Sequence, residues 1–347
     1  MNSDHIKSIS DNGNLYVYIP SYQSVFLYLH LLNISERHVT AIARTQNIKE
    51  LLIYLNVPYI DFAFEGNANF KSINQLLYQK RMILDWLNNI VDNSQLVIGY
   101  NSFDLPGFYL SSLWSYKKGL VFIKDLDPKR VLATFFSGNR ITKKIVSFIL
   151  QKLLIRYCWG VQNLCIFNAL PLTLGIDKKF LNYYGIKPLP NVTDSFMAER
   201  ISVCHKYAQT TDAKIIYVAD HSSLILPYIN KNHFEKLILS IQDRVVFKGH
   251  PRESIKDYII ADNWIPEFIP AEFFYPKVKI VVSVASAALY QAGYYGTICA
   301  VSLLNILDWH DLTAKERIED VLTKGDTNRT ILYPKTMEEF ISLLEKN

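Results

Sequence analysis

The sequence predicts an α/β protein made of two Rossmann-like domains that face each other across a cleft. A chain of 347 residues is long enough for two domains of ordinary size. Half of the residues are apolar, which provides for a core in each domain. Short apolar runs alternate with helix-length segments, and this alternation restarts in the second half of the chain, as expected for two doubly wound parallel sheets.

In the first half, apolar runs predict five strands separated by helical segments. The predicted strands are Leu15–Ile19, Val39–Ala43, Tyr59–Phe64, Leu96–Tyr100 and Leu120–Lys124. The predicted helices are Tyr22–Leu32, Ile48–Leu55, Phe70–Ile90 and Leu105–Tyr116.

The second half repeats this pattern and ends in a helix. The predicted strands are Lys214–Val218, Arg244–Lys248, Val278–Val284, Thr297–Leu303 and Thr330–Tyr333. The predicted helices are Ser222–Ile241, Ser286–Tyr294, Ala314–Leu322 and Thr336–Leu344. The pattern weakens at Tyr183–Asn191, where two prolines follow a glycine, so we expect domains at 1–185 and 186–347. The last helix is expected either to stay with the second domain or to pack back on the first.

Composition excludes several classes of function. A net charge of +5 is too small to indicate nucleic-acid binding. The four cysteines lack metal-ligand spacing and are expected to be reduced thiols of a cytoplasmic protein. The uncharged run Ile280–Leu307 is broken by polar residues and by Gly293 and Gly296, so it predicts strand, helix and strand and not a membrane span.

Two segments of the second half suggest an anion site. A buried strand ends at Lys248, which is followed by Gly249, His250 and Pro251. Ligands of open α/β sheets lie at the carboxyl ends of strands, where a lysine and a histidine can neutralise a phosphate. Further along, a strand leads into a helix with Ser286 at or next to its N-cap, where a hydroxyl and backbone amides can hold an anion.

Phe247-Lys-Gly-His-Pro251, followed by Pro270-Ala-Glu272 and the serine segment, resembles the His-Pro motif of bacterial sialyltransferases with the GT-B fold. Similar segments occur in teichoic-acid-type polymerases and in transferases of Kdo. The resemblance covers about residues 214 to 305. It implies an inverting transferase that moves a sialic acid from a CMP-activated donor to a glycan hydroxyl, for a bacterial capsule or lipooligosaccharide. No metal or other cofactor is implied. The first domain would bind the acceptor and the second the donor.

The resemblance also implies roles for individual residues. His250, in the motif with Pro251, would contact the donor phosphate and stabilise the departing CMP. Lys248 and Gly249 would line the cytosine and phosphate region, Glu272 would bind the ribose, and Ser286 would hold the phosphate. The family has two adjacent serines, whereas Ala287 follows Ser286 here, so either Ser283 or backbone amides would complete the phosphate site.

The catalytic base of the resembling enzymes lies in an Asp-Asp-Gly motif after a strand of the first domain. The best positional match is Asp125, with Asp127, Asp104 and Glu65 as successive alternatives. Asp125-Leu-Asp127 is also a DxD pattern, which in the GT-A fold holds a divalent metal and a nucleotide diphosphate. A metal-dependent GT-A transferase is therefore one alternative.

Three further alternatives stay open. The donor could be CMP-Kdo or a CDP-polyol, or the chain could be an inactive member of the family that binds glycans.

The segment 140–156 carries five basic residues and no acid, with apolar residues at helical spacing. It is expected to be a packed helix with a solvated basic edge, a peripheral contact with the inner face of the bacterial membrane, or a guide for an acidic acceptor.

Overall fold

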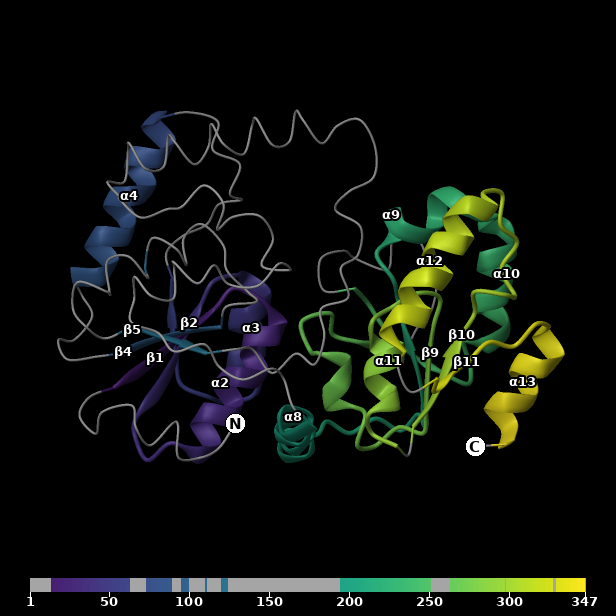
Figure 1. Ribbon diagram of the computed structural model, residues 1–347, viewed down its shortest axis with the longest axis horizontal. Coiled ribbons are helices and arrows are strands. Elements are labelled where there is room, and N and C mark those ends of the chain that lie inside the picture. The colour runs from purple at the N-terminus through teal and green to yellow at the C-terminus, as the bar shows by residue number, and fades with distance from the viewer. Residues whose placement is uncertain are drawn as a thin grey trace. The chain divides into compact units, whose positions relative to one another are not determined.

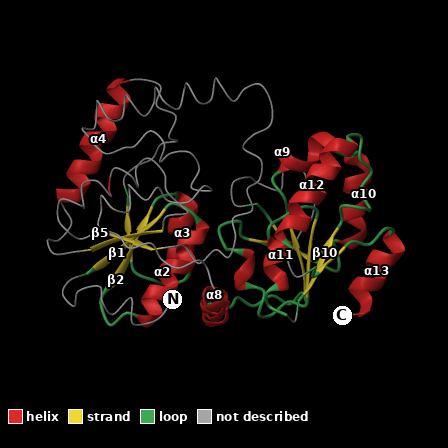
Figure 2. Ribbon diagram, viewed as in Figure 1, coloured by secondary structure: helices red, strands yellow, loops and turns green. Residues whose placement is uncertain are grey.

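The computed structural model comprises two compact units, Met1–Arg200 and Ile201–Asn347, each with its own sheet (Figure 1). The structure describes nine stretches of the chain: 14–62, 73–88, 95–99, 110, 120–123, 194–250, 263–296, 298–326 and 329–346. Helices and strands alternate in both units, which confirms the predicted α/β class (Figure 2).

The first unit contains a five-stranded parallel sheet in the order β3-β2-β1-β4-β5. Its strands are β1 (Leu15–Ile19), β2 (Val39–Ala43), β3 (Tyr59–Asp61), β4 (Gln95–Gly99) and β5 (Leu120–Ile123). Its helices are α2 (Tyr22–Ile34), α3 (Gln46–Tyr54) and α4 (Ile73–Asn88). Strand β1 lies between two neighbours and every residue in it is buried, which explains its continuous apolar sequence.

The second unit contains a six-stranded parallel sheet in the order β11-β10-β9-β6-β7-β8. The strands are β6 (Ile215–Val218), β7 (Val246–Lys248), β8 (Trp264–Ile265), β9 (Ile280–Ser283), β10 (Cys299–Ser302) and β11 (Ile331–Leu332). The helices are α9 (Ser222–Ile225), α10 (Lys231–Ile241), α11 (Ala288–Gly293), α12 (Leu312–Gly325) and α13 (Met337–Lys346), with short 3-10 turns η3 (Leu226–Tyr228) and η5 (Ala271–Phe273).

The core of the second unit lies between one face of its sheet and helices α10 and α13. Alternate strand residues, such as Tyr217 and Phe247, pack in one cluster with Leu237 of α10 and with Phe340 and Leu344 of α13. The last helix thus packs within the second unit. In Figure 1, α11 lies on the other side of these strands. Apolar residues on both faces require the continuous hydrophobic runs that the sequence shows.

Helix α8 (Asp194–Lys206) spans the boundary between the two units. Its first part belongs to the first unit, where the Arg200 guanidinium lies 4.0 Å from the centre of the Phe26 ring. Glu199 Oε2 lies 3.6 Å from His30 Nε2 in the same unit. The expected join at 183–191 lies outside the described residues.

One predicted helix is wrong. The segment Ser222–Ile241 is not continuous but forms α9, η3 and α10. Pro227 lacks an amide hydrogen and sits at the start of η3, and the Asn230 side chain then accepts a hydrogen bond from the His233 amide as the N-cap of α10. Helix α8 and the two-residue strand β8 were not predicted. The expected helix Leu105–Tyr116 is described only at residue 110, which is helical.

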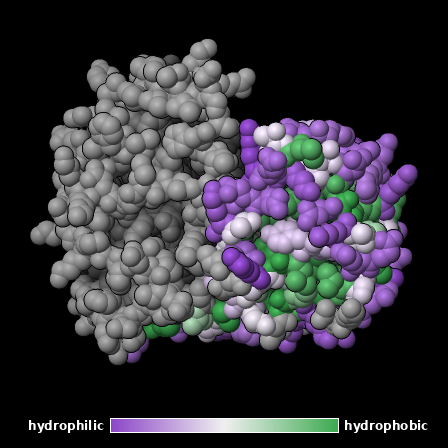
Figure 3. All heavy atoms as spheres, turned by 45° about the vertical axis from the view of Figure 1, so that its right-hand side comes forward, coloured by the Kyte–Doolittle hydropathy of each residue, from purple (hydrophilic) through white to green (hydrophobic). Residues whose placement is uncertain are grey.

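Within the described stretches, no helix has the length and apolar character needed to cross a membrane. Figure 3 shows hydrophilic residues over much of the visible face of the second unit, around smaller hydrophobic areas. The basic segment 140–156 lies outside the described residues. Cys204 and Cys299 form no disulfide, and the other two cysteines also lie outside the described part.

Two leucines of the second unit provide a matched test of this packing. Leu344 is 6% exposed in the core, whereas Leu312, at the start of α12, is 67% exposed. Replacing Leu344 with Ala should lower the free energy of unfolding by about 2–5 kcal/mol, because it leaves a cavity. Leu312→Ala should change it by less than about 0.5 kcal/mol. Urea unfolding measures both, and equal effects would contradict the assigned core.

Candidate functional site

The most informative edge of the second unit is the one where its parallel strands end. In chain order β6 is followed by β7 and β8 on one side, whereas β9, β10 and β11 add to the other side. The strand order therefore reverses between β6 and β9. Open α/β sheets bind ligands outside the carboxyl ends of their strands at such a reversal. The segments after β6, β7 and β9 form the candidate site.

Asp220 links two of these segments. It follows β6 and is 9% exposed. One carboxylate oxygen accepts hydrogen bonds from Ser283 Oγ at 3.0 Å and from the Val284 amide at 3.2 Å, while the Ala285 amide lies 3.2 Å from both oxygens. The turn after β9 is thus fixed against the end of β6 by one side chain.

Burial dominates the electrostatics of Asp220. Desolvation raises the pKa of its carboxyl from 3.8 to about 6, and the hydrogen bonds from Ala285, Ser283 and Val284 only partly oppose this rise. The charged form loses hydration on burial, and three protein donors replace only some of it. Ionisation of Asp220 therefore lowers the stability of the folded chain.

His250 and His221 are neighbours at this edge. His250 lies two residues beyond β7, and its ring centre is 5.1 Å from that of His221, in an edge-to-face arrangement with 72° between planes. His221 follows Asp220 directly, and its Nδ1 is 2.9 Å from Ser223 Oγ and accepts from the Ser223 amide at 3.4 Å. Two imidazoles and two hydrogen-bonded loops thus meet around the ends of β6 and β7.

The buried side chain of Lys248 binds backbone carbonyls next to the loop that follows β7. Its side chain is buried, and its Nζ donates to the carbonyl oxygens of Gly249 at 2.5 Å and Glu267 at 3.0 Å. Burial lowers the pKa of this amine to about 8, against the opposing charges of Glu267 and Glu272. Because its donors point to backbone oxygens, Lys248 acts here as a positioning group for the segment that carries His250.

Glu272 lies in η5, which is tied to the segment after β9. The Tyr275 hydroxyl donates to the Ala288 carbonyl at 2.9 Å, in the first turn of α11, and the Tyr275 ring packs edge-to-face on Tyr295. Glu272 is half-buried and is close enough to Lys248 to act on its charge. The segment carrying Glu272 therefore belongs to the same edge as Lys248 and α11.

Ser286 lies next to Ala287, the N-cap of α11, as expected. Its hydroxyl accepts from the Ala288 amide at 3.3 Å, while its own amide donates to Ser283 Oγ at 3.3 Å. Helix α11 has only six residues, so the loop and its hydroxyl, and not a long helix dipole, would have to hold an anion. Ser283 is fully buried between Asp220 and Ser286.

The predicted residues Lys248, Gly249, His250, Glu272, Ser283 and Ser286 thus all belong to segments joined at one edge of one sheet. Strands β7 and β9 each pair with β6, so their ends are separated by about 10 Å, two strand spacings.

Outside the described residues lie Pro251 of the motif and the carboxylates Asp125, Asp127, Asp104 and Glu65. Those carboxylates follow strands β5, β4 and β3 in the chain. No group of three or more possible metal ligands occurs among the described residues.

Sequence reasoning missed two residues of this site, Asp220 and His221. Their signal was available, because both come directly after a buried strand, in Val218-Ala-Asp-His-Ser-Ser223. Polar residues at a strand's carboxyl end are the pattern that singled out His250. The sequence could not reveal that β6 lies between β7 and β9, which makes its loop the centre of the site.

Neither a protein-family model nor a curated protein matches the sequence. Solved structures similar to this chain include UDP-GlcNAc 2-epimerase from Methanocaldococcus jannaschii, at 10% identity, covering 96% of this chain and 100% of that chain with a TM-score of 0.42. The glycosyltransferase SnogD from Streptomyces nogalater is 11% identical, with 96% and 90% covered and a TM-score of 0.43. Anabaena HepE in complex with UDP and glucose is 11% identical, with 96% and 89% covered and a TM-score of 0.40. Likeness at this level does not identify what this chain binds or catalyses.

Asp220 gives the site a predictable pH dependence. Its pKa is higher in the folded chain than in the unfolded chain, so its ionisation reduces stability as pH rises from about 4 to about 6. Asp220→Asn should remove this loss. Across that interval the variant should gain about 3 kcal/mol relative to the wild type, from two pKa units at about 1.4 kcal/mol each.

Urea unfolding at several pH values measures this difference. Asp243→Asn, at an exposed turn of the same unit, is the matched control and should follow the wild-type profile. If the two variants behave alike, Asp220 does not ionise in the buried setting described.

Proposed function

We propose that this protein is an inverting glycosyltransferase that moves a sialic acid from a CMP-activated donor to a hydroxyl group of a glycan. One observation carries the proposal: at a strand-order reversal, the His250 ring packs against His221 after β6, and the turn leading to Ser286 is hydrogen-bonded to Asp220 after β6. A nucleotide phosphate is the anion expected at such an edge.

The donor phosphate would be bound between the two loops. His250 would donate to it, and the hydroxyl of Ser286 would supply a second donor from the side of β9. The neighbouring His221 extends the imidazole surface and makes it suited to an anion when either ring is protonated. Glu272 would accept hydrogen bonds from the ribose hydroxyls, because carboxylates at such edges commonly bind ribose.

The reaction needs stabilisation of one leaving group and removal of one proton. The acceptor oxygen forms a bond to the anomeric carbon while the bond from that carbon to the phosphate oxygen breaks, and its electron pair leaves with CMP. Imidazole donors at the phosphate would lower the energy of this charge separation. The acceptor's proton would pass to a carboxylate of the first unit, for which Asp125 is the first candidate and Asp127 the second. No metal is assigned a part in these steps.

Nucleotide selectivity tests the donor assignment. CMP should raise the melting temperature of the full-length protein more than CDP, UDP or GDP at equal concentration, because only a ligand of the folded state stabilises it. At about 100 times its dissociation constant the expected stabilisation is about 2.7 kcal/mol. Best stabilisation by UDP or GDP would remove the CMP-sugar assignment, and best stabilisation by CDP would favour a CDP-polyol donor.

The role of His250 is tested by its replacement with Ala. Turnover of the CMP-activated donor, measured as CMP release with EDTA present, should fall by roughly 100- to 1,000-fold, the usual effect of losing one transition-state donor. His205→Ala, in an exposed histidine near the end of α8, is the control and should retain wild-type turnover. An active His250→Ala variant would contradict the leaving-group role.

A further inference from the structure

A cavity of about 560 Å³ lies in the first unit, where β2 and β3 end and α3 begins. Its volume falls within the range of about 300–1,000 Å³ typical of small-molecule sites. The described residues that line it come from the ends of both strands, from α3 and from α4: Ala43, Arg44, Thr45, Gln46, Lys49, Asp61, Phe62, Tyr78 and Met82. None of the residues assigned to CMP lies in this unit.

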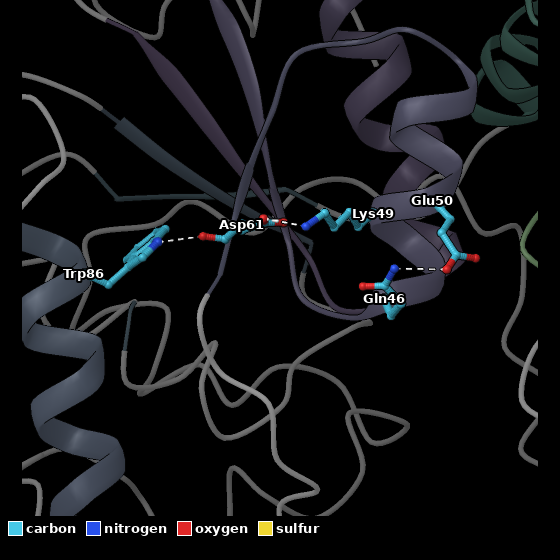
Figure 4. A network of polar contacts seen from close by, with 5 residues as sticks. All are labelled: Gln46, Lys49, Glu50, Asp61 and Trp86. Atoms are coloured by element: carbon cyan, nitrogen blue, oxygen red, sulfur yellow. Dashed lines mark hydrogen bonds and ion pairs between the residues drawn. The ribbon is translucent and has the colours of Figure 1, made fainter.

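The described lining of the cavity includes two cationic side chains, Arg44 and Lys49. Arg44 follows β2, and Gln46 and Lys49 come from the first turns of α3. The Lys49 ammonium lies 2.6 Å from the Asp61 carboxylate at the end of β3, and Figure 4 shows the two side chains meeting across the space between α3 and the strand. The hydrogen bond to Asp61 raises the pKa of Lys49, so its amine stays charged.

The lining also includes aromatic and apolar side chains. Phe62 follows Asp61, and its ring packs edge-to-face against Trp86 of α4 at 4.9 Å and against Tyr18 at 5.9 Å between centres. The Trp86 indole also donates to the Asp61 backbone carbonyl at 2.8 Å, on the side of Asp61 away from Lys49 (Figure 4). Tyr78 and Met82 add apolar surface from α4. Phe62 and Asp61 are thus held in place from two sides.

The charges and shape of the lining limit the ligand class. Among the described residues that line the cavity, Arg44 and Lys49 are cationic and Asp61 is the one carboxylate. A guanidinium binds a carboxylate with two parallel hydrogen bonds. Asp61 and Gln46 can bond to hydroxyl groups, and an aromatic wall can cover the apolar C–H face of a pyranose. An acidic sugar combines these three features.

We propose that this cavity binds an acidic sugar of the glycan acceptor, with its carboxylate at Arg44 and Lys49 and its apolar face toward Phe62 and Tyr78. The identification of the ligand as part of an acceptor rests on the proposed transferase function. The cavity itself adds a substrate class: the acceptor already ends in, or carries, a carboxylate-bearing sugar.

Three probes separate the parts of this recognition in NMR titrations of the full-length protein. The methyl α-glycoside of sialic acid should bind. Its methyl ester has the same rings and hydroxyls without the charge, and it should bind at least about 10-fold more weakly, since a hydrogen bond to a charged group contributes about 1.5–3 kcal/mol. Inorganic phosphate should not compete. Equal binding of acid and ester, or competition by phosphate at the same concentration, would overturn the acidic-sugar assignment.

Two arginines give a matched pair of variants. Arg44→Gln should weaken binding of the acid roughly 10- to 100-fold while leaving the weak binding of the ester unchanged. Arg81 lies on α4, outside the cavity lining, with its side chain 85% exposed and paired with Asp85. Arg81→Gln should bind the acid as the wild type does. Tyr78→Ala should weaken acid and ester alike, because it removes surface and not charge. Wild-type binding of the acid by Arg44→Gln would overturn the proposal.

CMP binding distinguishes failure of this inference from failure of the proposed function. If CMP stabilises the protein but the acid does not bind, the cavity assignment alone is wrong. If the acid binds through Arg44 while CMP has no effect, the cavity is an acidic-sugar site and the transferase function is wrong. In Arg44→Gln, stabilisation by CMP should equal that of the wild type.

Discussion

The buried carboxylate of Asp220 is the constraint on which the candidate site depends. Ser283, Val284 and Ala285 donate hydrogen bonds to it, and they form the end of β9 and the start of the turn that leads to Ser286. Burial makes the charge expensive, and its hydrogen bonds only partly offset that cost. Such a group is more easily understood as a positioning device for a ligand site than as a source of stability.

The remaining contacts extend this constraint along the sheet edge. Lys248 fixes the loop of His250 through two carbonyls, and Tyr275 fixes the segment of Glu272 against α11. The contacts of Lys248 with Glu267 and of Tyr275 with Ala288 join separate segments of the chain, so the fold itself holds the residues of the candidate site in position. Pre-organisation of this kind reduces the ordering cost of binding and of reaching a charged transition state.

The two units offer different chemistry at their strand ends. The second unit presents imidazoles and a serine hydroxyl, which suit a phosphate. The first unit presents a cavity whose described lining includes two cations and two aromatic side chains, where we propose that an acidic sugar binds. The proposed donor site and the proposed acceptor site would differ in chemistry, as a transfer between two sugars requires. The further inference and the proposed function therefore support each other while depending on different residues.

The sequence alone predicted most of the strands and several residues of the candidate site. Strand β1 is buried on both faces, so its residues are apolar without interruption and easy to recognise. The sequence did not indicate β8, because two residues are too few to show a periodic pattern. The continuous helix predicted from Ser222 was wrong because that prediction did not take account of Pro227. Motif spacing predicted His250 and Ser286 as site residues, and this assignment stays a prediction.

The tertiary structure decided which residues meet. Strand order cannot be read from a chain of similar apolar runs, and it is this order that puts β6 between β7 and β9 and makes Asp220 and His221 central. The cavity lined by Arg44 and Asp61 likewise exists only because β2 and β3 are neighbours. Local sequence specifies each element through burial and periodicity, whereas contacts between distant segments arise only when the sheet assembles.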